Sequence, residues 1–476
     1  MKANYINGQW RESDASLPNI NPSDLADKVD DFAVATGDDV AEAVAAAREA
    51  APAWAGLTPQ ARADILETIG REIVERKQEL GDLLAREEGK TLAEGIGEVN
   101  RAGQIFKYFA GEALRCEGSI LDSIRPGVSV EVTREPLGVV GAVTPWNFPS
   151  AIPAWKMAPA LAFGNTVVLK PAEWAPASAW ALIDICSRTD MPAGTVNLVM
   201  GSGIDTGAAL VGNPDLNALS FTGSRTTGNH IAKTCLAQNT KFQLEMGGKN
   251  PLIVLDDADL DQAVKVAVNG AFFSSGQRCT ASSRLIVTEG IHDRFVSHLK
   301  EALAGLVVGD ARDPSTHIGP VIDGRQLEKI LATIEEGRRE GARLVFGGDR
   351  VKAAKEGHYL SPTLFCDTHN TMVINREEIF GPVATVQCVK NYEEALAVAN
   401  DSEYGLSAGI CTNSLKFANH FKRHAQAGMI MVNLPTAGVD YHVPFGGTKQ
   451  SSYGHREQGR EAIGFYTSVK TTYLGC

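Results

Sequence analysis

The sequence predicts an α/β protein built from two doubly wound parallel-sheet domains. Beginning at Gly138, short apolar and β-branched runs alternate with helical segments, a pattern typical of buried parallel strands joined by helices. A second series of the same kind begins at Pro251. A chain of 476 residues is also too long for a single hydrophobic core, so two or three domains are expected.

The part of the chain before these series predicts a small β-rich segment followed by helices. Residues 1–35 have the pattern of short strands and turns, with an Asn-Gly hairpin signal inside residues 5–10. Helical patterns then cover residues 38–50, 59–80 and 92–109, where apolar side chains recur every three or four positions. We expect these helices to cover a sheet, with their charged faces forming solvated surface rather than binding sites.

Each α/β series divides into expected strands and helices. In the first series the strands are residues 139–143, 166–169, 196–199 and 218–221, and the helices include residues 176–187 and 226–237. In the second series the strands include residues 252–255 and 285–287, and helices lie near residues 290–304 and 323–340. Two further stretches, residues 121–134 and 465–474, alternate like exposed strands and could pair as an extension used between subunits.

Composition and charge limit the classes of partner. An apolar content of 44 % with 21 % charged residues is that of an ordinary soluble globular protein. The net charge of −12 argues against nucleic acid or an anionic membrane as a partner. Residues 136–155 carry no charge, but internal prolines at positions 145, 149 and 153 favour a buried strand and a turn over a membrane span.

The eight cysteines are widely spaced and include no Cys-X-X-Cys pair. This spacing predicts reduced thiols, and neither a disulfide framework nor a zinc or other metal site. The first ten residues lack the apolar core of a signal peptide. We therefore expect a soluble, cytoplasmic protein that binds no metal, no nucleic acid and no membrane.

Three residues are candidates for chemistry. Cys279 lies among small and polar residues beside Arg278, where a cation or backbone N–H groups could lower the pKa of its thiol; the alternative is a buried structural cysteine. Glu245 stands beside two glycines in an apolar approach and is a candidate general base, although most single glutamates are surface residues. Asn147 follows an expected strand and could donate an N–H to an oxyanion, or simply form a turn between two prolines.

Other strand ends suggest a nucleotide site. Residues 170–173, Lys-Pro-Ala-Glu, follow a strand at the place where a carboxylate can accept ribose hydroxyls, although surface Lys/Glu pairs are common. Residues 221–228 run from a strand through a Gly turn into a helix whose free N–H groups could hold a pyrophosphate, or form a plain capped turn. Residues 377–382 and 444–454 are Gly- and Pro-containing loops that could close over a cleft or lie on the surface.

Taken together and in this order, these motifs resemble those of the NAD(P)-dependent aldehyde dehydrogenase family, from Tyr5 to Leu474. The resemblance implies a homodimer or homotetramer of subunits with three parts. These parts are an NAD-binding domain of residues 1–116 and 137–247, a catalytic domain of residues 248–446, and oligomerisation strands within residues 117–136 and 463–476.

The resemblance also implies a role for each matching residue. Cys279 matches the nucleophile, Glu245 the general base and Asn147 the oxyanion donor, whereas Lys156 matches a lysine near the proton path. The implied cofactor contacts are Thr144, Pro145, Trp146, Lys170, Ala172, Glu173, Gly203, Phe221, Gly223, Ser224, Glu378 and Phe380. The expected substrate contacts are Phe148, Trp155, Phe273, Arg278, Thr280, His442 and Phe445.

The implied reaction is the oxidation of an aldehyde to a carboxylic acid through a thiohemiacetal and a thioester on Cys279. Glu173 favours NAD over NADP, the weaker alternative, because a carboxylate that accepts ribose hydroxyls repels a 2′-phosphate. A CoA-acylating enzyme should lack a water-activating carboxylate, so Glu245 argues against it. A non-catalytic structural protein on the same fold would require a decayed site, yet every matched position holds a competent residue.

Within the family, the whole chain resembles the 2-oxoglutaric semialdehyde (2,5-dioxopentanoate) and succinic semialdehyde dehydrogenase group. Succinic semialdehyde enzymes carry substrate-gripping arginines where this chain has Trp155 and Phe273, and these aromatics resemble an apolar tunnel. Arg278, Arg284 or His442 could pair with a substrate carboxylate, which an apolar wall cannot do. We expect a carboxylated semialdehyde such as 2-oxoglutaric semialdehyde, with succinic semialdehyde or apolar or aromatic aldehydes as alternatives.

Overall fold

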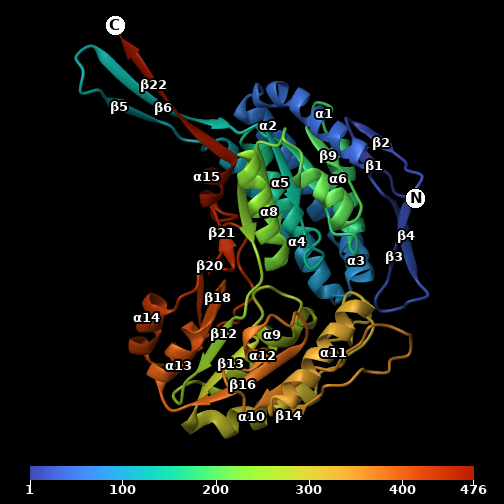
Figure 1. Ribbon diagram of the computed structural model, residues 1–476, viewed down its shortest axis with the longest axis vertical. Helices are drawn as coiled ribbons and strands as arrows, with labels where there is room; N and C mark the ends of the chain where they lie inside the picture. Colours follow the sequence, from blue (N-terminus) through green and yellow to red (C-terminus); the bar gives the residue numbers. More distant parts are fainter. Residues whose placement is uncertain (476) are drawn as a thin grey trace.

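The computed structural model describes residues 1–475 and has two lobes, each built around a mainly parallel sheet (Figure 1). A narrow β extension projects from the upper lobe, and the carboxyl-terminal strand ends at its tip (Figure 1). The predicted α/β class with parallel-sheet domains is confirmed. Within residues 1–475, no helix is both long and apolar enough to cross a membrane.

The first sheet has eight strands in the order β2-β1-β9-β8-β7-β10-β11-β21. Five of them are parallel, and they follow the order 3-2-1-4-5, in which the strand order reverses between β7 and β10. Ligands of such sheets bind beyond the carboxyl ends of the strands at this reversal. The strands are β1 (Asn4–Ile6), β2 (Gln9–Arg11), β7 (Val139–Val143), β8 (Thr166–Lys170), β9 (Val196–Leu198), β10 (Ala218–Thr222), β11 (Lys241–Glu245) and β21 (Ser452–Tyr453).

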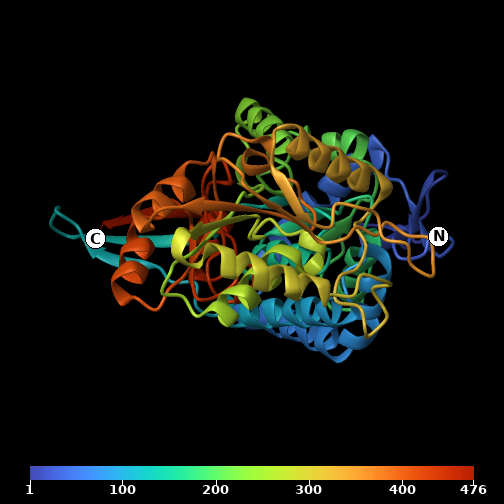
Figure 2. The same cartoon turned by 90° about the horizontal axis from the view of Figure 1, so that it is seen from below.

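Helices cover both faces of this sheet. Because successive residues of a strand point to opposite faces, neighbouring residues pack against different groups of helices. Val140 packs with one group of helices and Val139 with the other. The first group is α2 (Pro59–Glu75), α3 (Lys77–Glu88), α4 (Leu92–Ala113), α5 (Ala151–Ala162) and α6 (Pro176–Ser187); the second is α1 (Gly37–Ala55), α7 (Ala208–Val211) and α8 (Arg225–Gln238). In Figure 2 the blue helices α2–α4 and the green helix α8 lie on opposite sides of the molecule.

The second sheet has seven strands in the order β14-β15-β16-β13-β12-β18-β19, all parallel to their neighbours except β14. Its strands are β12 (Pro251–Val254), β13 (Arg284–Thr288), β14 (Arg343–Phe346), β15 (Thr363–Cys366), β16 (Val383–Val389), β18 (Ser407–Cys411) and β19 (Met429–Val432). Its helices are α9 (Leu260–Phe272), α10 (Glu289–Ala304), α11 (Gly324–Arg339), α12 (Val373–Arg376), α13 (Tyr392–Asn400) and α14 (Leu415–His424). Because β11 leads almost directly into β12, the two sheets meet near Glu245.

Local sequence explains where the elements that position the site begin and end. The expected Asn-Gly hairpin is confirmed, since Asn7 and Gly8 have φ angles of 51° and 76° between β1 and β2. The single helix expected over residues 59–80 is instead two helices, which break at Arg76 with φ −92° and ψ 12°. Helix α4 starts with a capping box, in which Thr91 and Glu94 satisfy each other's backbone N–H groups.

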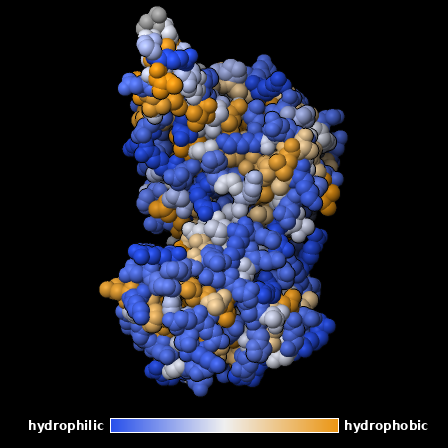
Figure 3. Space-filling view, turned by 60° about the vertical axis from the view of Figure 1, so that its left-hand side comes forward, coloured by the Kyte–Doolittle hydropathy of each residue, from blue (hydrophilic) through white to orange (hydrophobic). Residues whose placement is uncertain are grey.

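The extension consists of β22 (Thr467–Gly475), β6 (Val128–Pro136) and β5 (Ser119–Asp122). The expected pairing of these distant stretches is confirmed, because β22 and β6 are antiparallel over nine residue pairs. Apolar side chains gather on the extension and at its base (Figure 3). The most exposed of them on the extension are Ile120, Leu121, Ile124, Val469, Tyr473 and Leu474. Two short antiparallel pairs lie elsewhere: β3 (Ser16–Ile20) with β4 (Lys28–Ala33), and β17 (Tyr404–Gly405) with β20 (Thr448–Lys449). Helix α15 (Ile463–Tyr466) leads into β22.

Candidate active site

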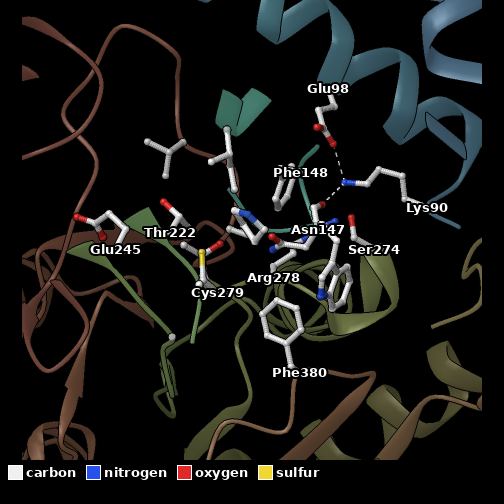
Figure 4. A pocket seen from close by; sticks show the side chains of 18 of the residues that line it. Lys90, Glu98, Asn147, Phe148, Thr222, Glu245, Ser274, Arg278, Cys279 and Phe380 are labelled. Atoms are coloured by element: carbon white, nitrogen blue, oxygen red, sulfur yellow. Dashed lines mark hydrogen bonds and ion pairs between the residues drawn. The ribbon is translucent and has the colours of Figure 1, made fainter. Parts of the chain in front are cut away.

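A cavity of about 470 Å³ opens where the two sheets meet, and most of the predicted catalytic side chains reach it (Figure 4). Its first wall comes from the carboxyl ends of β7, β10 and β11, which supply Asn147, Thr222 and Glu245. These ends lie together because Thr222 and Glu245 are paired in neighbouring parallel strands. The opposite wall carries Cys279 and Phe380 from the second lobe.

Cys279 lies in the loop between α9 and β13, and its backbone is fixed by the segment that leads into β12. The Asn250 side-chain amide donates to the carbonyl oxygen of Cys279 at 2.8 Å. Gly248 is required beside it, because a Cβ at position 248 would come within 2.5 Å of the same oxygen. Just before the cysteine, Ser274 and Ser275 adopt left-handed φ angles of 52° and 55°, a strained backbone of the kind found at functional sites.

The surroundings of Cys279 favour the protonated thiol. Burial raises its pKa, and the nearby carboxylates of Glu378 and Glu245 raise it further. The sequence suggested that a cation or backbone N–H groups would lower this pKa. The backbone N–H groups of Cys279 and Thr280 do oppose the rise without cancelling it, whereas Arg278 pairs with Glu94 at 2.9 Å. A base must therefore remove the thiol proton before or during attack.

Asn147 is buried beside Cys279 and held on three sides. Its side-chain N–H₂ donates to the carbonyl oxygen of Gln277 at 3.0 Å, which leaves a second N–H for another acceptor. Lys90 donates to the backbone carbonyl oxygen of Asn147 at 2.7 Å and to Glu98 at 2.7 Å (Figure 4). The other oxygen of Glu98 accepts the N–H groups of Ser150 and Ala151, at the start of α5, and so anchors the Asn147 loop.

Glu245 lies on the other side of Cys279 from Asn147 in Figure 4. It is only 2 % exposed, and one carboxylate oxygen accepts a hydrogen bond from Ser452 at 2.5 Å. The other oxygen has no hydrogen-bond partner within residues 1–475. Burial raises the pKa of Glu245 well above its usual value, the nearby Glu457 carboxylate raises it further, and the Ser452 bond opposes both effects. A carboxyl group with such a pKa can exchange protons near neutrality.

Lys156 lies behind this carboxylate and does not line the cavity. It forms a buried ion pair with Glu457 and donates to Ser220 at 2.8 Å. Burial lowers the pKa of Lys156, and Glu457 opposes that shift. Sequence reasoning gave Glu457 no role, because it stands in no distinctive motif and is 214 positions from its partner Gln243. Ser452 lies in the 444–454 loop, which was expected to close over a cleft, but its bond to Glu245, 207 positions away, was not predicted.

Helix α4 supplies a charged wall of the cavity, through Glu94, Glu98 and Arg101. The prediction that the charged faces of these helices are solvated surface is wrong here: Glu98 is only 5 % exposed, and Glu94 and Arg101 line the cavity with it. The signal available in the sequence was the spacing of Glu94, Glu98 and Arg101, which places all three on one helix face.

The predicted cofactor contacts occupy the strand ends that continue this first wall. Glu173 accepts the Gly203 N–H at 2.8 Å, which joins the ends of β8 and β9. Burial lowers the pKa of Lys170 to about 8, opposed by Glu173. Ser224 caps the amino terminus of α8 through the Thr227 N–H, and with Gly223 it lines the cavity. Phe221 belongs to the hydrophobic core and Ala172 is buried next to Glu173.

Two features of this region fit a dinucleotide. The hydroxyl oxygens of Thr144 and Thr222 are buried without hydrogen-bond partners in the described chain, and the α8 amino terminus offers free N–H groups. Glu378 lies against Gly247, where an added Cβ would come within 2.0 Å of its carboxylate, and accepts the Gly248 N–H at 2.9 Å. Burial raises the pKa of Glu378 to about 7, and the Gly248 N–H opposes the rise.

Aromatic and loop residues complete the cavity. Trp146 meets Phe380 edge to face with ring centroids 5.3 Å apart, and Phe380 has a left-handed φ of 58°. Trp155 stacks on Phe445 at 5.3 Å. The cavity is also lined by Pro145, Phe148 and Thr280, as the sequence led us to expect.

Three candidate substrate contacts do not line this cavity, and these expectations are corrected. Phe273 packs against the core of the second lobe. His442 is exposed and lies beside Tyr108 and Tyr441. Arg284 is 1 % exposed in β13, where it donates to the side chain of Asn370 at 2.6 Å and the Val398 carbonyl oxygen at 2.6 Å.

Comparison with known proteins is consistent with this geometry. The sequence model of the aldehyde dehydrogenase family matches residues 10–472. The chain is 42 % identical to alpha-ketoglutaric semialdehyde dehydrogenase of Bacillus subtilis (strain 168), over 99 % of this chain and 97 % of that protein. It is 39 % identical to 2,5-dioxopentanoate dehydrogenase of Saccharolobus solfataricus, over 96 % and 95 %. The crystal structure of betaine aldehyde dehydrogenase from Staphylococcus aureus in complex with NAD+ has a TM-score of 0.97 at 34 % identity, over 100 % of this chain and 95 % of that one.

Proposed function

The chain belongs to the aldehyde dehydrogenase family, and we propose that it oxidises a carboxylate-bearing semialdehyde, such as 2-oxoglutaric semialdehyde, to the corresponding acid with NAD as hydride acceptor. One observation supports the chemistry above all others. A cysteine, an amide donor and a buried carboxyl group of raised pKa, Cys279, Asn147 and Glu245, surround one cavity. A nucleophile, an oxyanion donor and a base are the three parts that acyl transfer through a thioester requires.

The first half of the reaction forms the acyl-enzyme. The Cys279 sulfur bonds to the aldehyde carbon while its proton passes to water in the cavity. The free N–H of Asn147 and the backbone N–H of Cys279 stabilise the resulting oxyanion. When the carbonyl re-forms, the C–H bond breaks with its electron pair and a thioester remains on Cys279. Bound NAD supplies the acceptor for that hydride.

The second half releases the acid. Glu245 takes a proton from a water molecule as the water oxygen attacks the thioester carbon. The C–S bond then breaks, and the proton passes from Glu245 to the departing sulfur, which returns the cysteine thiol and the carboxylate. Glu245 suits this role because one of its oxygens has no hydrogen-bond partner among the described residues and burial raises its pKa well above the usual value. Lys156 and Glu457 form an ion pair next to Glu245, and Ser220 is hydrogen-bonded to Glu457. These residues would relay a proton away from Glu245 or balance its charge.

The choice of NAD rests on the end of β8. Lys170 and Glu173 would bind the adenosine ribose, Ser224 and the α8 amino terminus the pyrophosphate, and Glu378 the nicotinamide ribose. The half-buried Glu173 carboxylate would repel a 2′-phosphate, which makes NADP the poorer cofactor.

We propose that the subunits assemble as a dimer or tetramer through the extension. Six apolar side chains of β5, β22 and the loop between β5 and β6 are exposed there, and monomeric proteins seldom leave such a group open to water. The seven cysteines of the described chain are all free thiols, which fits a reducing compartment such as the cytoplasm.

A panel of aldehydes tests the proposal. NADH or NADPH formation is followed by absorbance with 2-oxoglutaric semialdehyde, succinic semialdehyde, hexanal, benzaldehyde and betaine aldehyde, each with NAD and with NADP. We expect kcat/KM for the carboxylated aldehydes with NAD to exceed the others by at least about tenfold, which corresponds to about 1.4 kcal/mol of transition-state discrimination. A preference for hexanal, benzaldehyde or betaine aldehyde would refute the substrate class, and a preference for NADP would refute the cofactor.

A further inference from the structure

One of the basic side chains that line the cavity is not paired with a carboxylate of the described chain. Lys90, Arg101, Arg278 and Lys329 are the basic residues that line it. Lys90 is paired with Glu98 at 2.7 Å and Arg278 with Glu94 at 2.9 Å. Lys329 is exposed on α11. Arg101 has no carboxylate within 4.0 Å among residues 1–475.

The hydrogen bonds of Arg101 point to the same conclusion. One terminal N–H₂ group donates to the neutral side-chain oxygen of Gln458 at 3.0 Å. The Nε–H group is buried and has no partner in the described chain. Burial lowers the pKa of Arg101, with the negative charges of Glu98 and Asp440 opposing the shift. Such a guanidinium keeps its charge but has lost much of the water that would stabilise it.

A second unpartnered donor lies beside it. The indole Nε1–H of Trp155 is buried without a hydrogen-bond partner among the described residues. The Arg101 guanidinium carbon is 5.7 Å from the centroid of the Trp155 ring. Trp155 stacks on Phe445, and Phe445 packs against Cys279, so an aromatic wall leads from the reactive sulfur to the two donors.

We propose that Arg101 and Trp155 bind the carboxylate of the substrate while its aldehyde carbon lies at Cys279. The two oxygens of a carboxylate can accept hydrogen bonds from the Arg101 Nε–H and the Trp155 Nε1–H, which have no acceptor among the described residues. Its negative charge can pair with the guanidinium. Phe445 and the Trp155 face pack against the carbons in between. Gln458 acts as a positioning residue that fixes the guanidinium through its oxygen.

This inference rests on the proposed function and names the residues that set its substrate class. It replaces Arg284 and His442, which lie outside the cavity, and Arg278, whose charge Glu94 neutralises. It also implies discrimination against a cationic aldehyde such as betaine aldehyde, because a second positive charge would meet Arg101 in a partly desolvated cavity.

The test compares 2-oxoglutaric semialdehyde with pentanal, an uncharged aldehyde of the same carbon number, at saturating NAD. The quantity measured is the ratio of the two kcat/KM values for the wild type, Arg101→Leu, Arg101→Lys and Trp155→Phe. We expect Arg101→Leu to lower this ratio about 100-fold and Trp155→Phe about tenfold, with part of the loss restored in Arg101→Lys. Arg115→Leu is the matched control: Arg115 follows α4 on the surface, paired with Glu112, and its loss should leave the ratio unchanged.

A binding measurement does not depend on turnover of the charged substrate. Glutarate, an unreactive dicarboxylate, should inhibit pentanal oxidation by the wild type, and its inhibition constant should rise about 100-fold in Arg101→Leu. If the wild type prefers the carboxylated aldehyde and Arg101→Leu keeps that preference, the inference fails and the proposed function stands. Equal losses on both aldehydes with a lowered Tm would show a structural role and overturn it. A wild type without preference would refute the proposed substrate class itself.

Discussion

Two carboxylates line opposite sides of one cavity, and their surroundings move their pKa values in opposite directions. Burial raises the pKa of Glu245, and the Glu457 charge adds to the rise. Burial also pushes the pKa of Glu94 upward, but Arg278, Lys90 and hydrogen bonds from Ser274 and Thr91 bring it below its usual value. Burial therefore raises the pKa of both carboxyl groups. Their hydrogen-bond and charge partners make the difference between the two pKa values and decide which group can act as a base.

The difference separates a reactive region of the site from a supporting one. Around Glu245, one oxygen lacks a partner among residues 1–475, and the charge with the largest effect on its pKa is another carboxylate, Glu457. Around Glu94, both oxygens are bonded, one to Ser274 and Arg278 and the other to the Thr91 cap of α4. Glu94 therefore holds α4 against the loop before Cys279, and Glu245 is left free to exchange protons.

Removal of each carboxylate charge should give very different losses. Glu245→Gln should lower kcat with 2-oxoglutaric semialdehyde by about 10²–10⁴-fold, because a general base is lost. Glu94→Gln keeps the volume and part of the hydrogen bonding, and we expect a loss below about tenfold with a lower Tm. Steady-state NADH formation and thermal unfolding measure both effects. If Glu94→Gln were the more damaging to kcat, the assignment of the two regions would be reversed.

Asn147 lies next to the supporting region but acts on the reacting atoms. Asn147→Ala should reduce kcat by about 10²–10³-fold, the usual cost of one oxyanion donor, and leave traces of activity. Cys279→Ala should leave none, because no thioester can form. Both are measured by NADH formation with the same substrate. Equal residual rates in the two variants would contradict these roles.

The smallest expected effect is a shift in pH dependence. The base must be ionised, so kcat should rise with pH through the raised pKa of Glu245, above the range of an ordinary carboxyl group. The Ser452 hydrogen bond favours the ionised form, so Ser452→Ala should move this acid limb to higher pH by about one unit. Ser187→Ala, whose hydroxyl bonds the Asp184 carbonyl oxygen at 2.8 Å, is the control and should leave the limb in place. A limb that moved to lower pH in Ser452→Ala would rule out Glu245 as the titrating group.

The alternating pattern of the sequence was enough to predict the parallel sheets, and strand-end motifs were enough to predict which loops meet. Strands such as β8 are buried throughout, so their apolar runs are visible in the sequence. Asn147 follows such a run, and the topology rule for doubly wound sheets places it at the carboxyl edge. β11, which ends at Glu245, was not among the expected strands, because Lys241 and Gln243 interrupt its apolar pattern.

The supporting contacts could not be predicted in the same way. Lys90 and Asn147 are 57 residues apart, and Lys156 and Glu457 are 301 apart, so their pairing depends on how the helices and the returning carboxyl-terminal segment pack. Helical periodicity places Arg101 on a face with Glu94 and Glu98, but solvent and a substrate cavity are equally compatible with that pattern. No pattern in the sequence predicted that the Phe273 side chain packs against the core of the second lobe.

The most direct test of the proposed chemistry is the mass of Glu245→Gln after it reacts with 2-oxoglutaric semialdehyde and NAD. Acylation needs Cys279 and Asn147, whereas hydrolysis of the thioester needs the carboxylate. We predict a burst of about one NADH per subunit, together with a subunit mass increased by one acyl group that maps to Cys279. Glu94→Gln should show no accumulated adduct. A Glu245→Gln enzyme that gives neither burst nor adduct while its Tm is unchanged would contradict the division of labour between Cys279 and Glu245.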